Sequence, residues 1–392
     1  MIEITKLDHQ GRGIGRINNK IVFVPNTLPG EIVEIKYIKE KKNYIEGQAI
    51  KYIKKSNKRQ KPLCKYYNIC GGCNLMHLSY QDELEYKQKK VEEIIYKYTD
   101  KNINIKPIIP CEKEYNYRNK ITFHTNNKIG LYKKDTNEII DIDNCLLADN
   151  NINNILKELK KLNYTNEDIV VRSNNNKTLI YYKGTIDNIK NINADTIINN
   201  KQILKGNGHI EEYLNNLKFI ISPTSFFQVN TKQTLKLYEQ IKKLARLSKG
   251  DNILDLYCGT GTIGLYLSKY CKQVLGVEIN EEAINDANIN KQINNISNAK
   301  FIKGDAKKVI TDLHYKPDII IVDPPRSGLF KGMVEDLCKF NAKKIIYVSC
   351  DPITLSRDLK VLNKKYKIEL IQPVDMFPHT HHVENIAILE IK

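Results

Sequence analysis

A chain of 392 residues is long enough for two or three domains, each with its own core. With 62 Lys and Arg against 45 Asp and Glu, its formal net charge is +17, which favours a nucleic acid as partner because each neutralised phosphate releases a counterion. A Lys-rich composition throughout would explain the same excess without any partner. No run of about 18 apolar residues occurs, and the N-terminus lacks the apolar core of a secretory signal, so we expect a cytoplasmic protein without a membrane segment.

The N-terminal residues 1–55 alternate apolar and polar positions between Gly and Pro residues. The alternation at Ile2–Ile4, Ile21–Val24 and Glu31–Ile35 predicts short strands, and their spacing is typical of a small β-barrel. Between Lys36 and Lys61 the chain holds ten Lys or Arg and two Glu. We therefore expect a barrel that ends in a basic stretch.

The central residues 56–218 are expected to form a mixed α+β domain. The pattern predicts a helix over Tyr80–Tyr98, and a two-residue alternation over Tyr117–Phe123 predicts a strand. The Asn-rich residues 150–213 are weakly patterned and predict little beyond an assortment of strands and helices.

Four cysteines of this central region stand out by their spacing. Cys64, Cys70 and Cys73 are separated by five and two residues, and Cys145 follows about seventy residues later. Nine cysteines in a cytoplasmic chain favour a metal or redox site over a disulfide scaffold. Structural zinc usually shows two close pairs, whereas three clustered thiols with one remote thiol favour an iron–sulfur site. Zinc and free thiols remain the alternatives.

The C-terminal residues 219–392 show a different pattern. Apolar strand-like runs alternate with amphipathic helices, which predicts βαβ units and a largely parallel sheet with helices on both faces. The runs are NILDLYC, QVLGVEIN, AKFIKGDA, PDIIIVDPP and KKIIYVSC.

A glycine-rich turn, Asp255–Gly264, follows the first of these strands and opens a helix. Its glycines allow a tight turn and a close approach to a ligand, and Glu278 ends the next strand, where a carboxylate can bind ribose hydroxyls. The turn also fits the dinucleotide fingerprint G-x-G-x-x-G, so a nicotinamide enzyme is an alternative. The acidic Asp255 is poorly placed for a pyrophosphate but suits the ammonium group of S-adenosylmethionine. This turn and the motifs described next together lead us to expect S-adenosylmethionine as cofactor.

Two further strands end in reactive or polar residues. Asp323-Pro324-Pro325-Arg326 differs from the Asn-Pro-Pro-aromatic segment typical of enzymes that methylate amines. Cys350 ends the strand KKIIYVSC, at the sheet edge where open α/β sheets bind ligands, so its thiol is expected to face a cleft. For a cysteine at random a buried structural role is more common, and we assign that role to Cys258, Cys271 and Cys338.

Taken together, these motifs resemble the RNA uridine-5-methyltransferase family. The resemblance extends to Ser225–Asn230 (SFFQVN) and His381–Asn385 (HHVEN), and it covers essentially the whole chain. It implies three domains: an OB-like TRAM barrel over 1–55, an α+β domain with the cysteine cluster over 56–218, and an α/β Rossmann-like methyltransferase domain over 219–392.

The resemblance also implies site residues. Cys350 would be the nucleophile that adds to carbon 6 of uracil, which makes carbon 5 nucleophilic, and Glu384 the base that removes the carbon-5 proton. Phe226 would lie nearby. The residues implied at the cofactor and base pocket are Gln228, Tyr257, Gly259, Glu278, Asp305 and Asp323.

The cysteine arrangement resembles that of the ribosomal members of the family, where Cys64, Cys70, Cys73 and Cys145 would hold a 4Fe–4S cluster. The resemblance implies 23S ribosomal RNA as substrate. The T loop of transfer RNA is the alternative substrate, and a catalytically silent iron–sulfur RNA-binding assembly factor is the alternative function. We expect a monomer, and we expect the histidines at 379, 381 and 382 to face solvent or RNA rather than zinc.

Overall fold

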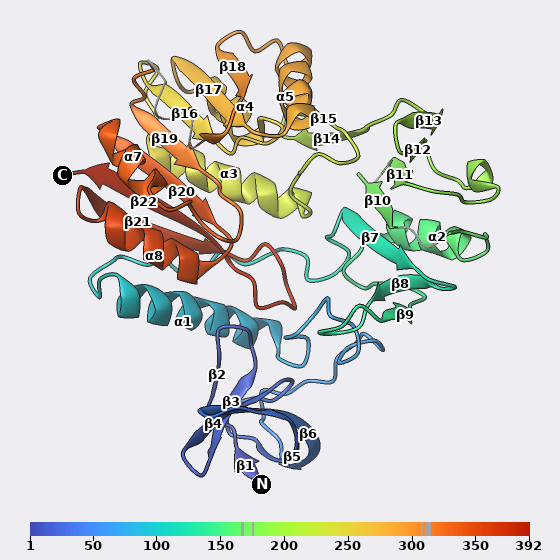
Figure 1. The fold of residues 1–392 in the computed structure, drawn as a ribbon. Helices are drawn as coiled ribbons and strands as arrows, with labels where there is room; N and C mark the ends of the chain where they lie inside the picture. The colour runs from blue at the N-terminus through green and yellow to red at the C-terminus, as the bar shows by residue number, and fades with distance from the viewer. Residues whose placement is uncertain (166–167, 175, 307–308, 310–314) are drawn as a thin grey trace.

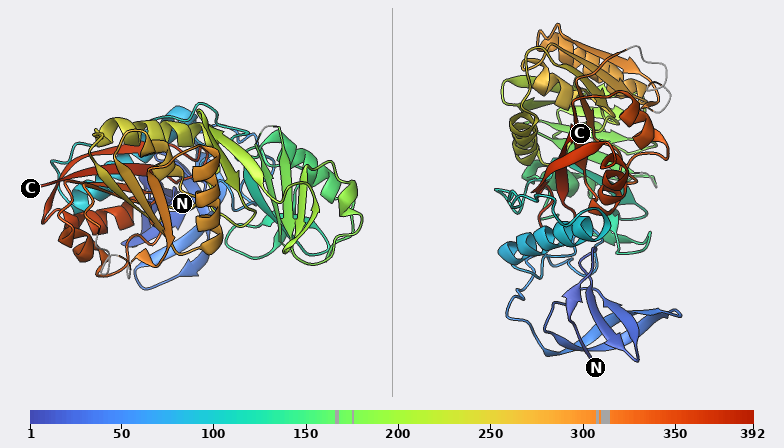
Figure 2. Two further views of the ribbon diagram at one scale, coloured as in Figure 1. Left: turned by 90° about the horizontal axis from the view of Figure 1, so that it is seen from above. Right: turned by 90° about the vertical axis from the view of Figure 1, so that its left-hand side faces the viewer.

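The computed structural model describes residues 1–165, 168–174, 176–306, 309 and 315–392. In this part of the chain a helix, α1 (Tyr80–Tyr98), lies between an N-terminal barrel and a C-terminal sheet, as Figure 1 and the right-hand view of Figure 2 show. A central sheet lies to one side of both. None of the described helices combines the length and the apolar character that a bilayer-spanning segment needs.

The N-terminal sheet closes on itself. Its order is β1-β5-β6-β4-β3-β2, yet β1 and β2 are halves of one segment interrupted only at Ile4 and Thr5. The amide of Ile4 donates to the carbonyl of Glu31, and that of Thr5 to the carbonyl of Ile14, each at 2.8 Å. Because one segment pairs with both edges, the predicted barrel is confirmed. Its strands are β1 (Ile2–Glu3), β2 (Lys6–Leu7), β3 (Gly13–Ile17), β4 (Lys20–Val24), β5 (Ile32–Glu40) and β6 (Tyr44–Lys54).

The central sheet has the order β13-β12-β11-β10-β7-β8-β9, with β11 and β12 parallel and the other pairs antiparallel. Helix α2 (Asn150–Leu159) buries its apolar side, including Ile155 and Leu156, against residues such as Phe123 and Val171 of the sheet. The strands are β7 (Lys120–Thr125), β8 (Ile129–Tyr132), β9 (Ile139–Asp141), β10 (Ile169–Ser173), β11 (Thr178–Tyr182), β12 (Thr196–Asn199) and β13 (Gln202–Lys205).

The C-terminal sheet has the order β18-β17-β16-β19-β20-β22-β21. The first five strands in this order are parallel, as the alternation of strands and helices predicts, whereas β22 runs antiparallel between β20 and β21. The strands are β16 (Asn252–Leu256), β17 (Gln273–Glu278), β18 (Ala299–Lys303), β19 (Ile319–Val322), β20 (Lys344–Ser349), β21 (Tyr366–Val374) and β22 (Glu384–Ile391).

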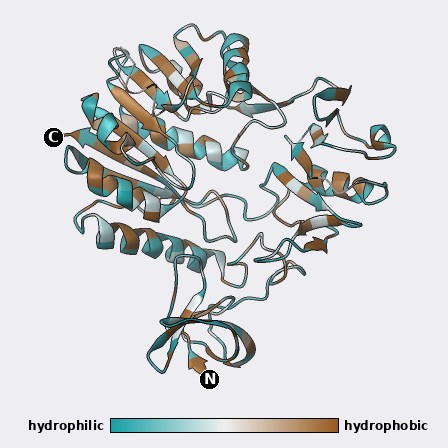
Figure 3. Ribbon diagram, viewed as in Figure 1, coloured by the Kyte–Doolittle hydropathy of each residue, from teal (hydrophilic) through white to brown (hydrophobic). Residues whose placement is uncertain are grey.

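Both faces of this sheet are covered by helices. Successive strand residues point to opposite faces, so Ile253 belongs to one apolar cluster whereas Leu254 and Leu256 belong to the other. The strands are accordingly hydrophobic along most of their length, and the helices show mixed character (Figure 3). The helices are α3 (Thr231–Ala245), α4 (Thr262–Ser268), α5 (Glu281–Ile293), α7 (Met333–Lys339) and α8 (Pro352–Leu362).

Segments that precede residue 219 complete this C-terminal core. Ile210 of the hairpin β14 (Ile210–Leu214) and β15 (Leu217–Ile221) lies in one apolar cluster, and Val91 and Ile95 of α1 lie in the other. The sheet is also extended beyond β21, because the amide of Ile109 donates to the carbonyl of Pro373 at 3.0 Å.

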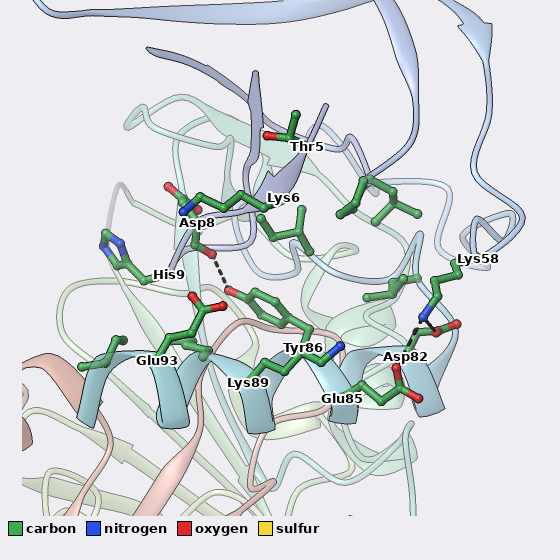
Figure 4. A pocket seen from close by; sticks show the side chains of 16 residues that line it. Thr5, Lys6, Asp8, His9, Lys58, Asp82, Glu85, Tyr86, Lys89 and Glu93 are labelled. Atoms are coloured by element: carbon green, nitrogen blue, oxygen red, sulfur yellow. Dashed lines mark hydrogen bonds and ion pairs between the residues drawn. The ribbon is translucent and has the colours of Figure 1, made fainter. Parts of the chain in front are cut away.

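Helix α1 also carries the barrel on its opposite side (Figure 4). The hydroxyl of Tyr86 donates to the backbone carbonyl of Asp8 at 2.8 Å, and Lys58 forms an ion pair with Asp82. A cavity of about 280 Å³ separates the two elements around these contacts. One helix therefore joins the barrel to the C-terminal sheet.

Candidate active site

The residues predicted at the ends of separate strands converge on one edge of the C-terminal sheet. Strands β16, β17, β19 and β20 are parallel neighbours, so the residues that follow or end them share the carboxyl edge. These residues are Tyr257, Glu278, Asp323 and Cys350. In open α/β sheets, ligands bind at this edge.

The turn after β16 has an unusual backbone. Tyr257, Gly259 and Gly261 all have positive φ angles, of 62°, 54° and 77°. A Cβ atom at Gly261 would lie 2.7 Å from the ring of Phe301, whereas one at Gly259 would meet no atom of the described residues within 4 Å. Gly261 is therefore needed for packing, and Gly259 borders open space. The left-handed conformation of Tyr257 is rare for a residue with a side chain and is typical of functional sites.

Carboxylates surround this turn. Glu278 accepts a hydrogen bond from the amide of Gly259 at 3.2 Å, and Asp255 accepts one from the amide of Gly264 at 3.1 Å. The second carboxylate oxygen of Asp255 is buried and has no hydrogen-bond partner among the described residues. Burial, with a contribution from Asp323, raises the pKa of Asp255 to about 8. A buried acceptor without a partner suits a bound hydrogen-bond donor, and a cation most of all.

Tyr257 and Asp305 lie on the same side of the turn. Burial and the carboxylate of Asp305 raise the pKa of Tyr257 to about 12, so its hydroxyl stays protonated, and it donates to the sulfur of Met333 at 3.0 Å. Asp305 follows β18, the neighbour of β17. The structure thus brings four of the expected cofactor residues together: Tyr257, Gly259, Glu278 and Asp305.

The register of β22 places a carboxylate beside the expected nucleophile. Ser349 of β20 pairs with Asn385 of β22 in an antiparallel ladder. Cys350 follows Ser349 and Glu384 precedes Asn385, so the next pair in this register is Cys350 with Glu384. Cys350 is half-buried, Glu384 is 4% exposed, and the two lie across from each other at the edge of the sheet.

Burial raises the pKa values of three ionisable groups at this edge, and neighbouring carboxylates add to the shift for two of them. Burial, followed by the carboxylate of Glu384, raises the pKa of the Cys350 thiol to about 12, and the nearby Arg326 opposes the shift. Burial raises the pKa of Asp323 to about 7, and burial and Asp323 together raise that of Glu384 to about 8. Near neutral pH the two carboxyl groups are therefore poised between their protonated and ionised forms.

The segment 375–383, which leads into Glu384, is partly buried. His379 is fully buried, so the expectation that it faces solvent or RNA is wrong. Its backbone has a positive φ of 67°, and its ring stacks on Tyr115 with centroids 4.5 Å apart. His381 and His382 are partly exposed, and the imidazole of His382 lies 3.2 Å from the guanidinium of Arg326. The physical reason for the error is that the amide of His379 donates to Glu83 of α1 and its ring packs against Tyr115, which buries the residue.

The residues from Ser225 to Asn230 lead into α3. Phe227 lies in the core and Gln228 is 8% exposed, whereas Phe226 is 65% exposed. Asn230 caps the helix, accepting from the amide of Gln233 at 3.3 Å. Further along α3, the hydroxyls of Tyr238 and Thr262 lie 2.8 Å apart, which connects the helix with the cofactor turn.

The four cysteines of the central region line one cavity of about 250 Å³, together with residues such as Tyr67, Met76 and Leu147. Burial, then the neighbouring thiols Cys145, Cys70 and Cys64, raise the pKa of Cys73 well above its ordinary value. In the part of the chain that the structure describes, no group of three or more His, Cys, Asp or Glu side chains is placed to hold a metal ion. The thiols share a cavity without converging on a single point.

Two residues of the site have no role in the sequence-based assignment. Arg326 is exposed, yet its charge acts on both Cys350 and Glu384. Asn74, directly after Cys73, forms hydrogen bonds with the segment that leads into Glu384. The adjacent motif DPPR was a signal for Arg326, but no local pattern could have linked Asn74 with residues 300 positions away.

Comparison with known proteins agrees with this geometry. Residues 185–392 match the family described as tRNA (Uracil-5-)-methyltransferase, and residues 1–50 match the TRAM domain. An uncharacterized RNA methyltransferase of Clostridium acetobutylicum is 39% identical, over 99% of this chain and 96% of its own length. Another from Bacteroides thetaiotaomicron is 33% identical, over 98% of this chain and 99% of its own.

Among solved structures, the tRNA (uracil-54, C5)-methyltransferase of Pyrococcus abyssi in complex with S-adenosyl-L-homocysteine is 30% identical. It covers 99% of this chain and 100% of its own, with a TM-score of 0.80. The family match covers more than half of the chain, and the relatives match it almost from end to end. The chain therefore belongs to the S-adenosylmethionine-dependent RNA (uracil-5-)-methyltransferases that carry a TRAM domain.

Proposed function

We propose that this enzyme methylates carbon 5 of a uridine in structured RNA through a covalent adduct between Cys350 and carbon 6 of the base. The observation that carries the proposal is the register of β20 and β22, in which Cys350 and Glu384 are the next pair after Ser349 and Asn385. A nucleophile and a base on adjacent strand ends can act on neighbouring carbons of one planar ring.

The chemistry needs a thiolate first. Carbon 5 of uracil is too weak a nucleophile to attack a methyl sulfonium, but a bond from the Cys350 sulfur to carbon 6 moves an electron pair into an enolate and activates it. S-adenosylmethionine, when bound, supplies the electrophilic methyl group. The enolate electron pair forms the bond from carbon 5 to the methyl group. Glu384 then takes the proton from carbon 5, the electron pair of that C–H bond re-forms the double bond between carbons 5 and 6, and the Cys350 thiolate leaves. Each cycle releases one proton and returns Cys350 to its starting state.

The charges at the site suit these steps. A carboxylate whose pKa is about 8 is a stronger base than an exposed one, which favours Glu384 for removing a carbon-bound proton. The thiol of Cys350, with a pKa near 12, is protonated in the free enzyme. Arg326 is the group that favours its ionised form, and the thiol proton leaves to solvent before attack.

The residues of the cofactor turn fit S-adenosylmethionine. The buried oxygen of Asp255 without a partner would accept from the ammonium group, and Glu278 at the end of β17 would bind the ribose hydroxyls. The open space at Gly259 admits the ligand close to the backbone. Asp305 would bind the adenine amine, and Gln228 and Asp323 would line the pocket of the target base.

We propose 23S ribosomal RNA as the substrate, on the resemblance of the cysteine arrangement to the ribosomal branch of the family. A uridine of the transfer-RNA T loop is the second candidate. It is favoured by the likeness over the full chain, at 30% identity, to an enzyme that acts on uracil 54 of tRNA. Transcripts of both RNAs, assayed side by side with labelled methyl donor, separate the candidates, because only one should gain 5-methyluridine.

We also propose that Cys64, Cys70, Cys73 and Cys145 hold a 4Fe–4S cluster. A cubane gives each of its four irons one thiolate, so its ligands surround a cavity instead of meeting at one ion. A shared cavity of about 250 Å³ lined by all four thiols supports that arrangement better than a single zinc ion. The proposed methyl transfer is not a redox reaction and needs no electron donor or acceptor, so the cluster would be structural.

The covalent mechanism is tested with RNA that contains 5-fluorouridine, since fluorine cannot be removed by a base and the adduct is trapped. The wild-type enzyme should form a complex with RNA that survives denaturation, and Cys350→Ala should form none and lose methylation. Cys338→Ala removes a half-buried thiol on α7 and should behave as wild type. Full methylation by Cys350→Ala would refute the assignment of the nucleophile.

A further inference from the structure

The segment that leads into Glu384 is held by residues far away in the sequence. His379 is central to this segment, with a left-handed backbone that its own side chain does not favour. Its amide donates to the Glu83 carboxylate at 2.8 Å, and its carbonyl accepts from the amides of Asn74 and Leu75, each at 3.1 Å. The conformation is thus fixed from outside.

A buried ionic cluster supports the same segment. Lys87 of α1 is fully buried and donates to Glu83 at 2.6 Å and to Asp375 at 2.7 Å. It also donates to the carbonyl of Phe377 at 3.1 Å, and the hydroxyl of Tyr80 donates to Asp375 at 2.7 Å. Buried charges persist only when paired in this way, so α1 is tied firmly to the start of the segment.

His381, three residues before Glu384, is held at its amide, its carbonyl and its ring. The side-chain oxygen of Asn74 accepts from its amide at 2.8 Å, and the Lys90 ammonium donates to its carbonyl at 2.7 Å. The side-chain amide nitrogen of Asn74 lies 2.6 Å from Nδ1 of the His381 ring. Burial, followed by the neighbouring His382 and the cations Lys90 and Arg326, lowers the pKa of His381 to about 2, so the neutral ring can accept that bond.

We propose that Asn74 is a positioning residue for the reaction: its side chain holds His381, and thereby sets the direction in which residues 381–384 present the Glu384 carboxylate to carbon 5. Asn74 itself touches neither of the reacting groups. The inference rests on the proposed role of Glu384 as base. A base displaced by about 1 Å loses much of its rate, because proton transfer requires close alignment.

We expect the loss of the Asn74 side chain to slow one step of the reaction, the removal of the carbon-5 proton. Asn74→Ala removes both side-chain bonds to His381, so kcat should fall about tenfold while the KM for RNA changes less than about twofold. Because loss of the carbon-5 proton becomes slower than the other steps, uridine deuterated at carbon 5 should react more slowly than ordinary uridine, by a larger ratio than in the wild type. A role in folding alone would not change this isotope effect.

Two variants serve as controls. Asn74→Asp keeps the acceptor for the amide of His381 and can pair with the other tautomer of its ring, so it should restore kcat and the isotope effect. Asn298→Ala removes a side chain that also bridges distant carbonyls, those of Ser268 and Cys271, away from the site, and should leave both unchanged. If Asn74→Ala fails to fold, Lys90→Met removes the bond to the carbonyl and should give the same defect.

The outcomes are distinguishable. A wild-type isotope effect and kcat in Asn74→Ala, or a rise in KM alone, would overturn the positioning role, and so would an Asn74→Asp variant that folds but is as slow as Asn74→Ala. The proposed function is tested separately by the wild-type enzyme. If wild type forms no trapped adduct with 5-fluorouridine RNA, the covalent mechanism is wrong, whatever the Asn74 variants do.

Discussion

The enzyme has two candidate sites that contain partly buried thiols, one at Cys350 and one at the four central cysteines, and they are built in opposite ways. Cys350 follows a regular strand, between β20 and a helix capped by Asp351, so its position is set by ladder hydrogen bonds on one side and a helix cap on the other. The cysteines at 64, 70 and 73 lie in irregular backbone outside the named strands and helices. Cys70 is held by a bond from its amide to the carbonyl of Tyr66 at 2.8 Å and by an isolated β-bridge to Lys133.

This difference predicts what each site needs. A thiol on a packed sheet stays in place without any ligand, because burial of the strands fixes it. Thiols on irregular backbone around a cavity are held by fewer regular backbone bonds, so the proposed cluster, when bound, would stabilise them. We therefore expect catalysis to depend on single side chains around Cys350. We expect the stability of the folded protein to depend on the proposed cluster at the central cysteines.

The largest effect is expected from the base. Glu384→Gln should lower kcat about a thousandfold, within the range typical of a lost general base, and let the methylated adduct accumulate because its release is blocked. The adduct is measured on denaturing gels with ordinary uridine RNA. Glu390→Gln alters a carboxylate on the same strand that pairs with Lys344 at 3.2 Å and should leave turnover unchanged. Rapid turnover by Glu384→Gln would assign the base to another group.

The second effect concerns the cavity. Cys73→Ser, purified without air, should lack iron and labile sulfide and melt about 5–10 °C below the wild type, which should be brown. Cys338→Ser is the matched control and should keep both colour and melting temperature. Activity should fall far less in Cys73→Ser than in Glu384→Gln. Zinc in place of iron in protein never exposed to air would show that the cluster is assigned wrongly.

The smallest effect concerns how the stability of the folded state changes with pH. Burial raises the pKa of Glu384 from 4.5 to about 8, so between these values the folded state binds more protons than the unfolded state, and stability falls as pH rises. Because glutamine does not ionise, Glu384→Gln should remove this part of the loss of stability at high pH. Its melting temperature relative to the wild type should increase by a few degrees between pH 5 and pH 9, by scanning calorimetry. A difference that is constant with pH would contradict the raised pKa.

Much of the C-terminal domain could be predicted, because each parallel strand is a local apolar run and the residues that end it lie at a common edge. Cys350, Asp323 and Glu278 are examples of residues placed by this rule alone. The expected helix over Tyr80–Tyr98 also has the bounds of α1. Ser79 caps its N-terminus, where the side-chain hydroxyl accepts a hydrogen bond from the amide of Asp82.

The rest depends on contacts that no local pattern contains. β22 enters the sheet between two earlier strands, so the pairing of Cys350 with Glu384 required knowledge of the register. His379 was expected to face solvent or RNA because the three histidines lie too close together for a zinc site, yet it is buried, with its amide bonded to Glu83 of α1. The Asn-rich residues 150–213 gave little signal, because asparagine is compatible with both turns and strand ends.

Helix α1 fixes the distance between the N-terminal barrel and the segment that leads into Glu384. Since Tyr86 and Lys58 attach the barrel on one side of it, and Lys87 and Lys90 attach the catalytic segment on the other, a strand of RNA that touches both parts meets them at a set spacing. An RNA that is bound by the barrel and methylated at Cys350, as proposed, would therefore have to span this fixed distance between its flanking backbone and the target base.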